Sequence, residues 1–118
     1  MTPARPSVLP VPQRHIVKIQ STGTKLAYVD GTTGKSAAAI RVKRGDVVQW
    51  HFEHGNFSIV FKGRSPFAEP GYAGTGNVPT RDAEVTGADG KYEYAVTVVP
   101  AKGQPILDDP NVIVGDGD

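Results

Sequence analysis

The 118-residue chain contains no cysteine. This absence excludes disulfides, thiol catalysis, zinc sites built on cysteine and the thiolate ligand of a blue-copper centre. An excess of either charge is also missing, because 13 Lys and Arg residues are balanced by 12 Asp and Glu residues for a net charge of +1. Dedicated nucleic-acid or membrane-surface binders carry a clear basic excess, so we expect neither kind of partner.

Long apolar runs are absent as well, and none approaches the roughly 18 residues needed to cross a membrane. Prolines at positions 3, 6, 10 and 12 interrupt the region where a signal peptide would need its apolar stretch. A cytoplasmic location is therefore the default expectation. The same prolines predict a flexible arm over residues 1–13, and the acidic, glycine-rich end predicts a flexible tail over residues 115–118.

Glycine and proline are plentiful, with 14 and 10 residues, and they separate short apolar segments. This arrangement is typical of all-β domains and indicates one such domain over residues 14–114. Burying one face of each strand favours a two-sheet β-sandwich of seven or eight strands. The alternating segments predict strands at 15–19, 25–29, 37–42, 46–52, 56–61, 91–98 and 111–114, with a weaker one at 82–86.

The alternation also predicts the core, because successive side chains of a strand point to opposite faces. In the 46–52 strand, Val48, Trp50 and Phe52 share the face expected to point inward. The same reasoning gives a predicted core of Val17, Ile19, Leu26, Tyr28, Ile40, Val42, Val48, Trp50, Phe52, Phe57, Ile59, Phe61, Tyr92, Tyr94, Val96 and Val98.

Three stretches, RGDVVQWHF at 44–52, NFSIVF at 56–61 and DGKYEYAVTV at 89–98, carry a family resemblance. Through them roughly residues 36–114 resemble the cupredoxin-like family. The resemblance implies an antiparallel Greek-key β-sandwich, and in that family a type-1 copper bound by two histidines, a cysteine and a methionine.

The residues that fall on the family's copper-ligand positions are apolar in this chain. Phe57 and Val99 stand at the two histidine positions and Val96 at the cysteine position, and the only methionine is Met1. Because a soft thiolate is central to such a site, the resemblance implies the scaffold without blue-copper electron transfer. We therefore expect no cofactor, and fold alone does not transfer function.

Residues 62–81, KGRSPFAEPGYAGTGNVPTR, interrupt the strand pattern. A long loop rich in glycine and proline inside a small domain is often functional or mobile. It carries Arg64, Phe67, Glu69 and Tyr72, and arginine with aromatic residues is typical of protein contact surfaces. We expect a non-enzymatic binding module with this segment as its contact surface. Its partner is another protein chain or a second copy of itself, with pairing through a sheet edge as a further mode of association. In the alternative interpretation, Phe67 packs beneath the segment and anchors it, and Tyr72 lies on the sandwich.

Histidine and carboxylate residues offer an alternative function. His51, Glu53 and His54 form a local cluster of types that bind copper(II) or zinc, and His15 is a further candidate ligand. In a straight strand positions 51 and 54 face opposite sides, so a shared metal requires a bend at Gly55. Ordinary strand and turn positions explain the same residues.

A third hypothesis is a small enzyme, whose signature would be a pocket with a buried carboxylate or histidine of shifted pKa.

Overall fold

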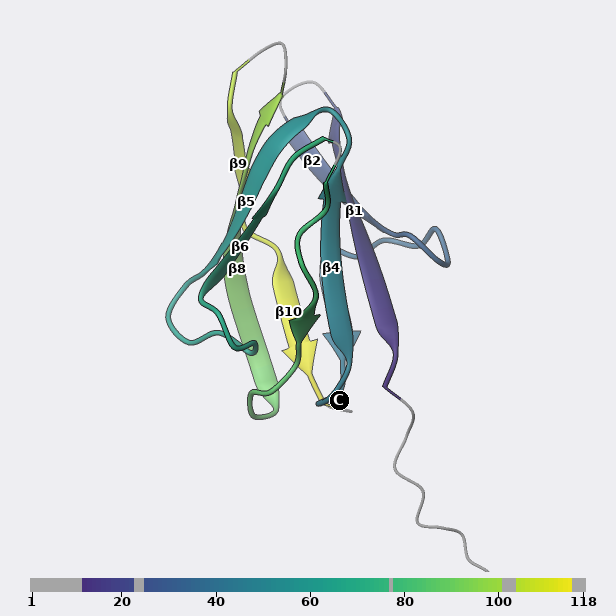
Figure 1. Ribbon diagram of the computed structural model, residues 1–118, viewed down its shortest axis with the longest axis vertical. Helices are drawn as coiled ribbons and strands as arrows, with labels where there is room; N and C mark the ends of the chain where they lie inside the picture. The colour runs from purple at the N-terminus through teal and green to yellow at the C-terminus, as the bar shows by residue number, and fades with distance from the viewer. Residues whose placement is uncertain (1–11, 23–24, 77, 101–103, 116–118) are drawn as a thin grey trace, which may run out of the picture.

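The computed structural model describes residues 12–22, 25–76, 78–100 and 104–115. Two β-sheets pack face to face around one core (Figure 1). No helix occurs among these residues, so none is long and apolar enough to cross a membrane. The strands are β1 (Arg14–Thr22), β2 (Lys25–Asp30), β3 (Ala39–Val42), β4 (Val47–Phe52), β5 (Gly55–Phe61), β6 (Gly71–Gly74), β7 (Ala83–Glu84), β8 (Gly90–Pro100), β9 (Ile106–Asp108) and β10 (Asn111–Val114).

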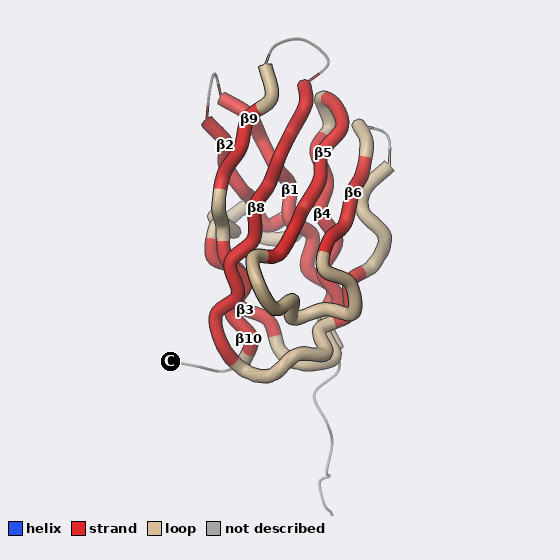
Figure 2. The backbone as a smooth tube through the Cα atoms, turned by 90° about the vertical axis from the view of Figure 1, so that its left-hand side faces the viewer, coloured by secondary structure: helices blue, strands red, loops and turns tan. Residues whose placement is uncertain are grey.

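The strand order is β2-β1-β4-β7 in the first sheet and β3-β10-β8-β5-β6 in the second, where β9 also pairs with β8 (Figure 2). β1 and β4 run parallel, as do β10 and β3, whereas the other pairs are antiparallel. The expectation of purely antiparallel sheets is therefore wrong at these two pairs. The chain crosses repeatedly between the sheets, and such crossovers place parallel strands side by side.

Every expected strand is present, although several ends differ by a residue or more. The prediction of seven or eight strands is nevertheless wrong for the described residues, because β6 and β9 were not expected. β6 has the sequence GYAG and β9 is only three residues long. Neither carries the apolar alternation that marks a strand, so their pairing depends on the neighbours β5 and β8.

Of the expected arm and tail, residues 1–11 and 116–118 lie outside the described residues. The described boundary residues are bound to the sheets. The Gln13 N–H donates to Asp46 Oδ1 over 3.0 Å, and the Gly115 N–H donates to the carbonyl of Val42 over 2.8 Å. The ordered domain therefore extends slightly beyond residues 14–114 on both sides.

The predicted core is confirmed at every position except Leu26, which is only partly buried and packs against the core. Trp50 lies at its centre, edge-on to Tyr94 with ring centroids 5.6 Å apart. The Trp50 Nε1–H donates a hydrogen bond of 3.2 Å to the Tyr94 hydroxyl. Burial raises the pKa of Tyr94 well above its usual range, so this hydroxyl stays protonated inside the sandwich. Sequence alternation did not identify seven further buried residues: Ala37, Phe67, Tyr72, Ala83, Val85, Val112 and Val114.

Candidate functional site

The 62–81 segment has two structurally distinct parts, and the first is tied to the end of the sandwich. The Pro66 carbonyl accepts hydrogen bonds of 2.9 Å from the N–H groups of Thr86 and Gly87. The Ser65 hydroxyl donates to the Glu69 carbonyl over 2.7 Å and accepts from the Phe67 N–H over 3.1 Å. These contacts satisfy several of its backbone polar groups without a regular element.

The two aromatic residues of the segment lie in the core. Phe67 and Tyr72 are only 5% and 7% exposed. Phe67 meets Trp50 edge-on at 5.7 Å, whereas Tyr72 stacks on Trp50 at 6.1 Å with an interplanar angle of 28°. The burial of both rings favours the alternative interpretation, in which Phe67 anchors the segment, over the expectation that both rings belong to a contact surface.

Arg64 and Glu69 are exposed but lie apart. The Arg64 guanidinium is 5.8 Å from the centroid of the Tyr92 ring, in a small hollow that also contacts Lys62. Glu69 Oε2 lies 3.3 Å from Arg81 Nη2. The four residues expected to form one surface are therefore divided between the core and two separate exposed places.

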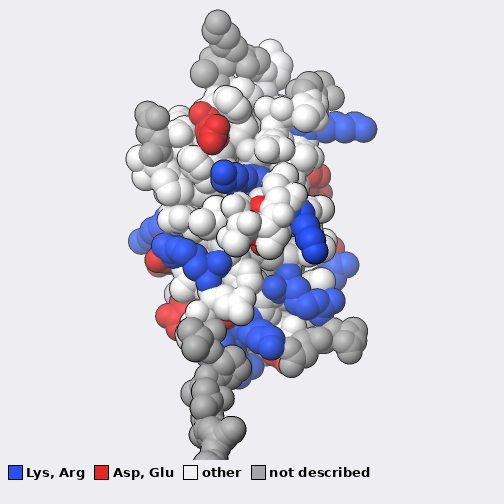
Figure 3. Space-filling view, turned by 90° about the vertical axis from the view of Figure 1, so that its right-hand side faces the viewer, with Lys and Arg blue, Asp and Glu red and all other residues white. Residues whose placement is uncertain are grey.

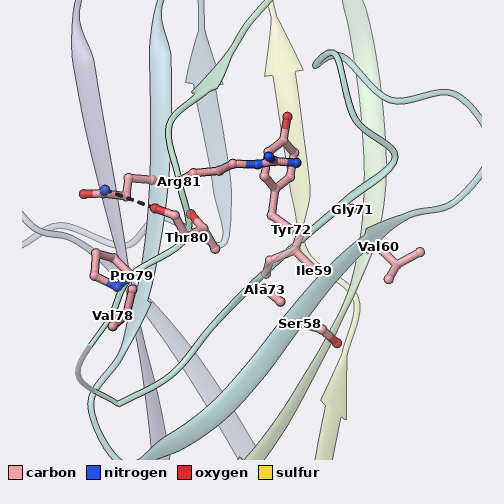
Figure 4. A pocket seen from close by; sticks show the side chains of 11 residues that line it. Ser58, Ile59, Val60, Gly71, Tyr72, Ala73, Val78, Pro79, Thr80 and Arg81 are labelled. Carbon is pink, nitrogen blue, oxygen red and sulfur yellow. Dashed lines mark hydrogen bonds between the residues drawn. The ribbon is translucent and has the colours of Figure 1, made fainter.

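The second part of the segment lines a groove of about 720 Å³ on the outside of the molecule (Figure 4). We call it the β6 groove, because β6 runs between its walls. It is lined mostly by apolar groups, with Arg81 as its charged residue. Its lining consists of Gln49, Ser58, Ile59, Val60, Gly71, Tyr72, Ala73, Val78, Pro79, Thr80 and Arg81.

The groove exists because the chain separates from β6 after a tight turn. The N–H of Thr75 donates to the carbonyl of Val78 over 2.8 Å, and the chain then crosses to the first sheet. There the Thr80 N–H donates to the Trp50 carbonyl over 3.0 Å, and the Thr80 hydroxyl accepts from the Trp50 N–H over 3.0 Å. The two arms of the turn thus belong to different sheets and leave a hollow between them.

Gly74 permits the close approach at the base of this turn. A Cβ at this position would lie 2.7 Å from the Phe57 ring and 2.7 Å from the Val78 carbonyl oxygen. Real Cβ atoms do not come so close, so either the ring or the turn would have to move.

We expect Gly74→Ala to lower the free energy of unfolding by about 1–3 kcal/mol, because overpacking displaces well-packed neighbours. Urea denaturation monitored by Trp50 fluorescence measures this change. Ala73→Ser, at the exposed neighbouring position, serves as the control and should change stability by less than about 0.5 kcal/mol. Equal stability of Gly74→Ala and wild type would show that the turn does not pack against β5 as described.

Charged residues occur on both outer faces of the sandwich, including Lys91 and Glu93 on β8, but one part of the surface lacks them. Figure 3, which views the molecule from the right-hand side of Figure 1, shows lysine and arginine side chains spread over that face. The opposite face is built by the second sheet. Along its upper strands the outward residues of the described structure are uncharged: Asn56, Ser58, Val60, Gly71, Ala73, Ala95, Thr97, Val99 and Leu107. The β6 groove borders this uncharged face.

The histidine cluster lies near the turn between β4 and β5. His51 is half-buried on the outer side of β4, whereas Glu53 and His54 are exposed in the turn, and all three line a cavity of about 330 Å³ beside β1. The His54 ring lies edge-on to Phe52 at 5.9 Å. Within the described ranges no group of three or more His, Asp or Glu side chains is placed to hold a metal ion.

His15 does not join this cluster, because it is bound to Asp46 in a different part of the first sheet. His15 Nε2 lies 2.9 Å from Asp46 Oδ2. A carboxylate only accepts hydrogen bonds, so this contact places a proton on Nε2. Asp46 also accepts the Gln13 N–H and the Lys43 N–H, each over 3.0 Å, and thereby joins the start of β1 to the turn before β4. Its role is structural.

Burial by itself would raise the pKa of Asp46, but hydrogen bonds from Gln13, His15 and Lys43 outweigh it and lower that pKa below its usual value. A carboxylate with a lowered pKa in the folded state stabilises the fold above its unfolded pKa of about 4, and this contribution is lost as the pH falls through the folded pKa.

We expect Asp46→Asn to lower the free energy of unfolding by about 2–3 kcal/mol at pH 7, because it removes charged hydrogen bonds in a buried site. Denaturation curves between pH 7 and pH 2 measure the difference from wild type. The difference should shrink as the pH falls below about 4, where Asp46 becomes protonated. A difference that is undiminished at pH 2 would contradict this assignment.

At the positions that the cupredoxin resemblance assigns to copper ligands, Phe57 and Val96 are buried, whereas Val99 is 45% exposed on the outer face. These side chains therefore do not converge on one pocket. No protein-family model matches the chain, and no curated protein matches it significantly. Its function must be argued from its own geometry.

Proposed function

We propose that this chain is a non-enzymatic, metal-free binding module that contacts another protein chain through the β6 groove. The observation that carries this proposal is the pair of valines at the groove. Val60 and Val78 are 53% and 59% exposed, although few large apolar side chains of the described residues are exposed at all. Exposed apolar side chains gathered at a concave site are typical of interaction surfaces.

The proposal keeps the expected location of the contact surface but changes its residues. Most of the groove comes from positions 71–81 of the 62–81 segment, whereas Phe67 and Tyr72 supply rigidity from below. A partner would meet a preformed surface, because Tyr72 is fixed by its stacking on Trp50. Preformed surfaces lose less conformational entropy on binding.

We propose a cupredoxin-like, Greek-key connectivity for the scaffold. Support comes from the three stretches that carry the resemblance, which form β4, β5 and β8 and lie inside their respective sheets. The placement of the side chains supports the metal-free part of the proposal. Among the described residues, His51, Glu53 and His54 do not form a group that could hold a metal ion. His15 is bound to Asp46 instead. The cytoplasmic location stays a prediction.

The non-enzymatic part of the proposal is supported by the way the chain itself uses its buried carboxylate, Asp46. An enzymatic site would hold such a group in a pocket, facing a substrate. Asp46, whose oxygens accept three hydrogen bonds from the chain itself, has a structural role that explains its burial and its lowered pKa.

Site-specific photo-cross-linking tests the contact surface. A photoreactive residue at Val78 in the groove should give a discrete adduct in a lysate of the source organism. One at Leu107, which is more exposed but lies outside the groove, should not. Excess unlabelled wild type should compete for the adduct, and excess Val60→Asp should not. Equal adducts at both positions, or full competition by Val60→Asp, would contradict the proposal.

A further inference from the structure

We propose that the β6 groove binds an extended peptide as an additional β-strand along β6, and that this peptide alternates aliphatic and acidic side chains. The inference rests on the proposed function and names the chemistry of the partner. Strand addition to an exposed sheet edge derives affinity from main-chain hydrogen bonds and specificity from alternate side chains.

The backbone of β6 has the free edge that strand addition needs. β6 is the last strand in the order of its sheet, and among the described residues it pairs with β5 alone. The Phe61 N–H donates to the Pro70 carbonyl over 2.8 Å, so position 70 is a hydrogen-bonded partner in the antiparallel ladder. Because such positions alternate, Tyr72 directs its N–H and C=O toward β5, and Gly71 and Ala73 direct theirs away from it.

Gly71 and Ala73 each carry one N–H and one C=O at this edge, and no other described residue bonds to these outward groups. Two donors and two acceptors, spaced two residues apart, match the main chain of an extended peptide. Their side chains are a hydrogen and a methyl group, so nothing bulky shields the edge. Long or flat free edges are normally blocked by charged or bulky groups.

The surroundings of the edge predict which side chains such a peptide carries. Along β6, Tyr72 points inward while Gly71 and Ala73 point outward, and an added strand would alternate in the same way. On the inward side the Arg81 guanidinium lies 5.8 Å from the Tyr72 ring centroid and its side chain is 71% exposed. On the outward side the neighbour across the β5–β6 pair is Val60.

Arg81 therefore favours an acidic residue on the inward side of the added strand, and an alternating peptide offers one there in either strand direction. Its guanidinium has five N–H donors, and Glu69 is its carboxylate partner at 3.3 Å, which leaves capacity for a second carboxylate. Figure 4 shows Val78 and Pro79 on one side of β6, Val60 on the other, and Arg81 extending toward Tyr72. Aliphatic side chains fit the valine-lined walls.

A second copy of this chain fits less well than an acidic peptide. Pairing of two β6 edges about a two-fold axis would bring each Arg81 close to the Arg81 of the other copy, and like charges at short range disfavour association. An alternating acidic peptide places an opposite charge at the same position.

The test uses the full chain and a synthetic hexapeptide of alternating valine and glutamate, with a fluorophore on its N-terminus and an amide at its C-terminus. Fluorescence anisotropy of the labelled peptide should show saturable binding with a dissociation constant below about 1 mM. The matched peptide with lysine in place of glutamate should bind at least tenfold more weakly. Arg81→Glu should reverse this preference.

Ala73→Pro tests the main-chain contact, because proline removes only an N–H that points away from β5, and edge strands tolerate proline. It should weaken peptide binding at least tenfold, whereas Ala73→Ser, which keeps the N–H, should bind like wild type. A peptide whose backbone nitrogens are methylated tests the same contact on the unaltered protein and should also bind at least tenfold more weakly.

Equal binding of the methylated and unmethylated peptides would overturn strand addition, as would absence of binding by the valine-glutamate peptide. Sedimentation equilibrium showing a dimer that Ala73→Pro dissociates would overturn it too, because a second copy would then occupy the edge. The proposed function is tested separately, since cross-linking at Val78 does not depend on how a partner's backbone is placed.

Discussion

Phe67→Ala should lower the free energy of unfolding by about 3–4 kcal/mol, even though Phe67 lies in a segment with no regular pattern in the sequence. The ring is 5% exposed and packs edge-on against Trp50, Phe61 and Tyr72 at 5.7, 5.4 and 6.0 Å. Truncation removes these contacts and leaves a cavity between the sheets. Guanidinium chloride denaturation followed by Trp50 fluorescence measures the effect.

Val78→Ala is the matched control for Phe67→Ala, because it removes an apolar side chain from the same 62–81 segment at an exposed position. It should change stability by less than about 0.5 kcal/mol. A similarly small change for Phe67→Ala would mean that this ring is exposed in solution, and the division of the segment into a buried and an outward part would fail.

Trp50→Ala has the larger expected effect, about 4–5 kcal/mol, which is comparable with the whole stability of a small domain. Trp50 is fully buried, and its ring is in contact with Phe61, Phe67, Tyr72 and Tyr94. Its loss also leaves the buried Tyr94 hydroxyl without the indole donor. We expect a chain that is largely unfolded near 37 °C, as measured by far-ultraviolet circular dichroism on heating.

Tyr94→Phe separates the hydrogen bond from the packing. It keeps the ring and removes the hydroxyl that accepts the Trp50 Nε1–H, so the expected cost is only about 1–2 kcal/mol. If Trp50→Ala proved no more destabilising than Tyr94→Phe, the aromatic cluster would not be the centre of the core.

Much of the fold could be predicted from the sequence, because its strands alternate cleanly. In β4, for example, Val48, Trp50 and Phe52 are buried while Gln49 and His51 are half-buried on the other face. Such alternation fixes which face of a strand points inward but not which strand lies beside it. The parallel pairing of β1 with β4 depends on crossovers between sheets, which local sequence does not specify.

The residues of the candidate site were harder to predict from the sequence than the fold. Arginine and aromatic residues in an irregular segment suggested a contact surface, but Tyr72 is buried because β6 pairs with β5 and turns every second side chain inward. The GYAG sequence of β6 gives no strand signal. The valines of the groove come from different segments of the chain. The pairing of β5 with β6 places Val60 along β6, and the hydrogen bonds between Thr75 and Val78 place Val78 there too. Glycine at position 74, which permits that turn, was the one usable signal.

The most direct test of the account is to locate peptide binding by NMR. Titrating ¹⁵N-labelled protein with the valine-glutamate hexapeptide should shift the amide signals of Gly71, Ala73 and Arg81, which line the β6 groove. The amides of His51 and His54, which line the other cavity, should stay unchanged. Shifts centred on the two histidines, with Gly71 and Ala73 unaffected, would contradict the assignment of the contact surface.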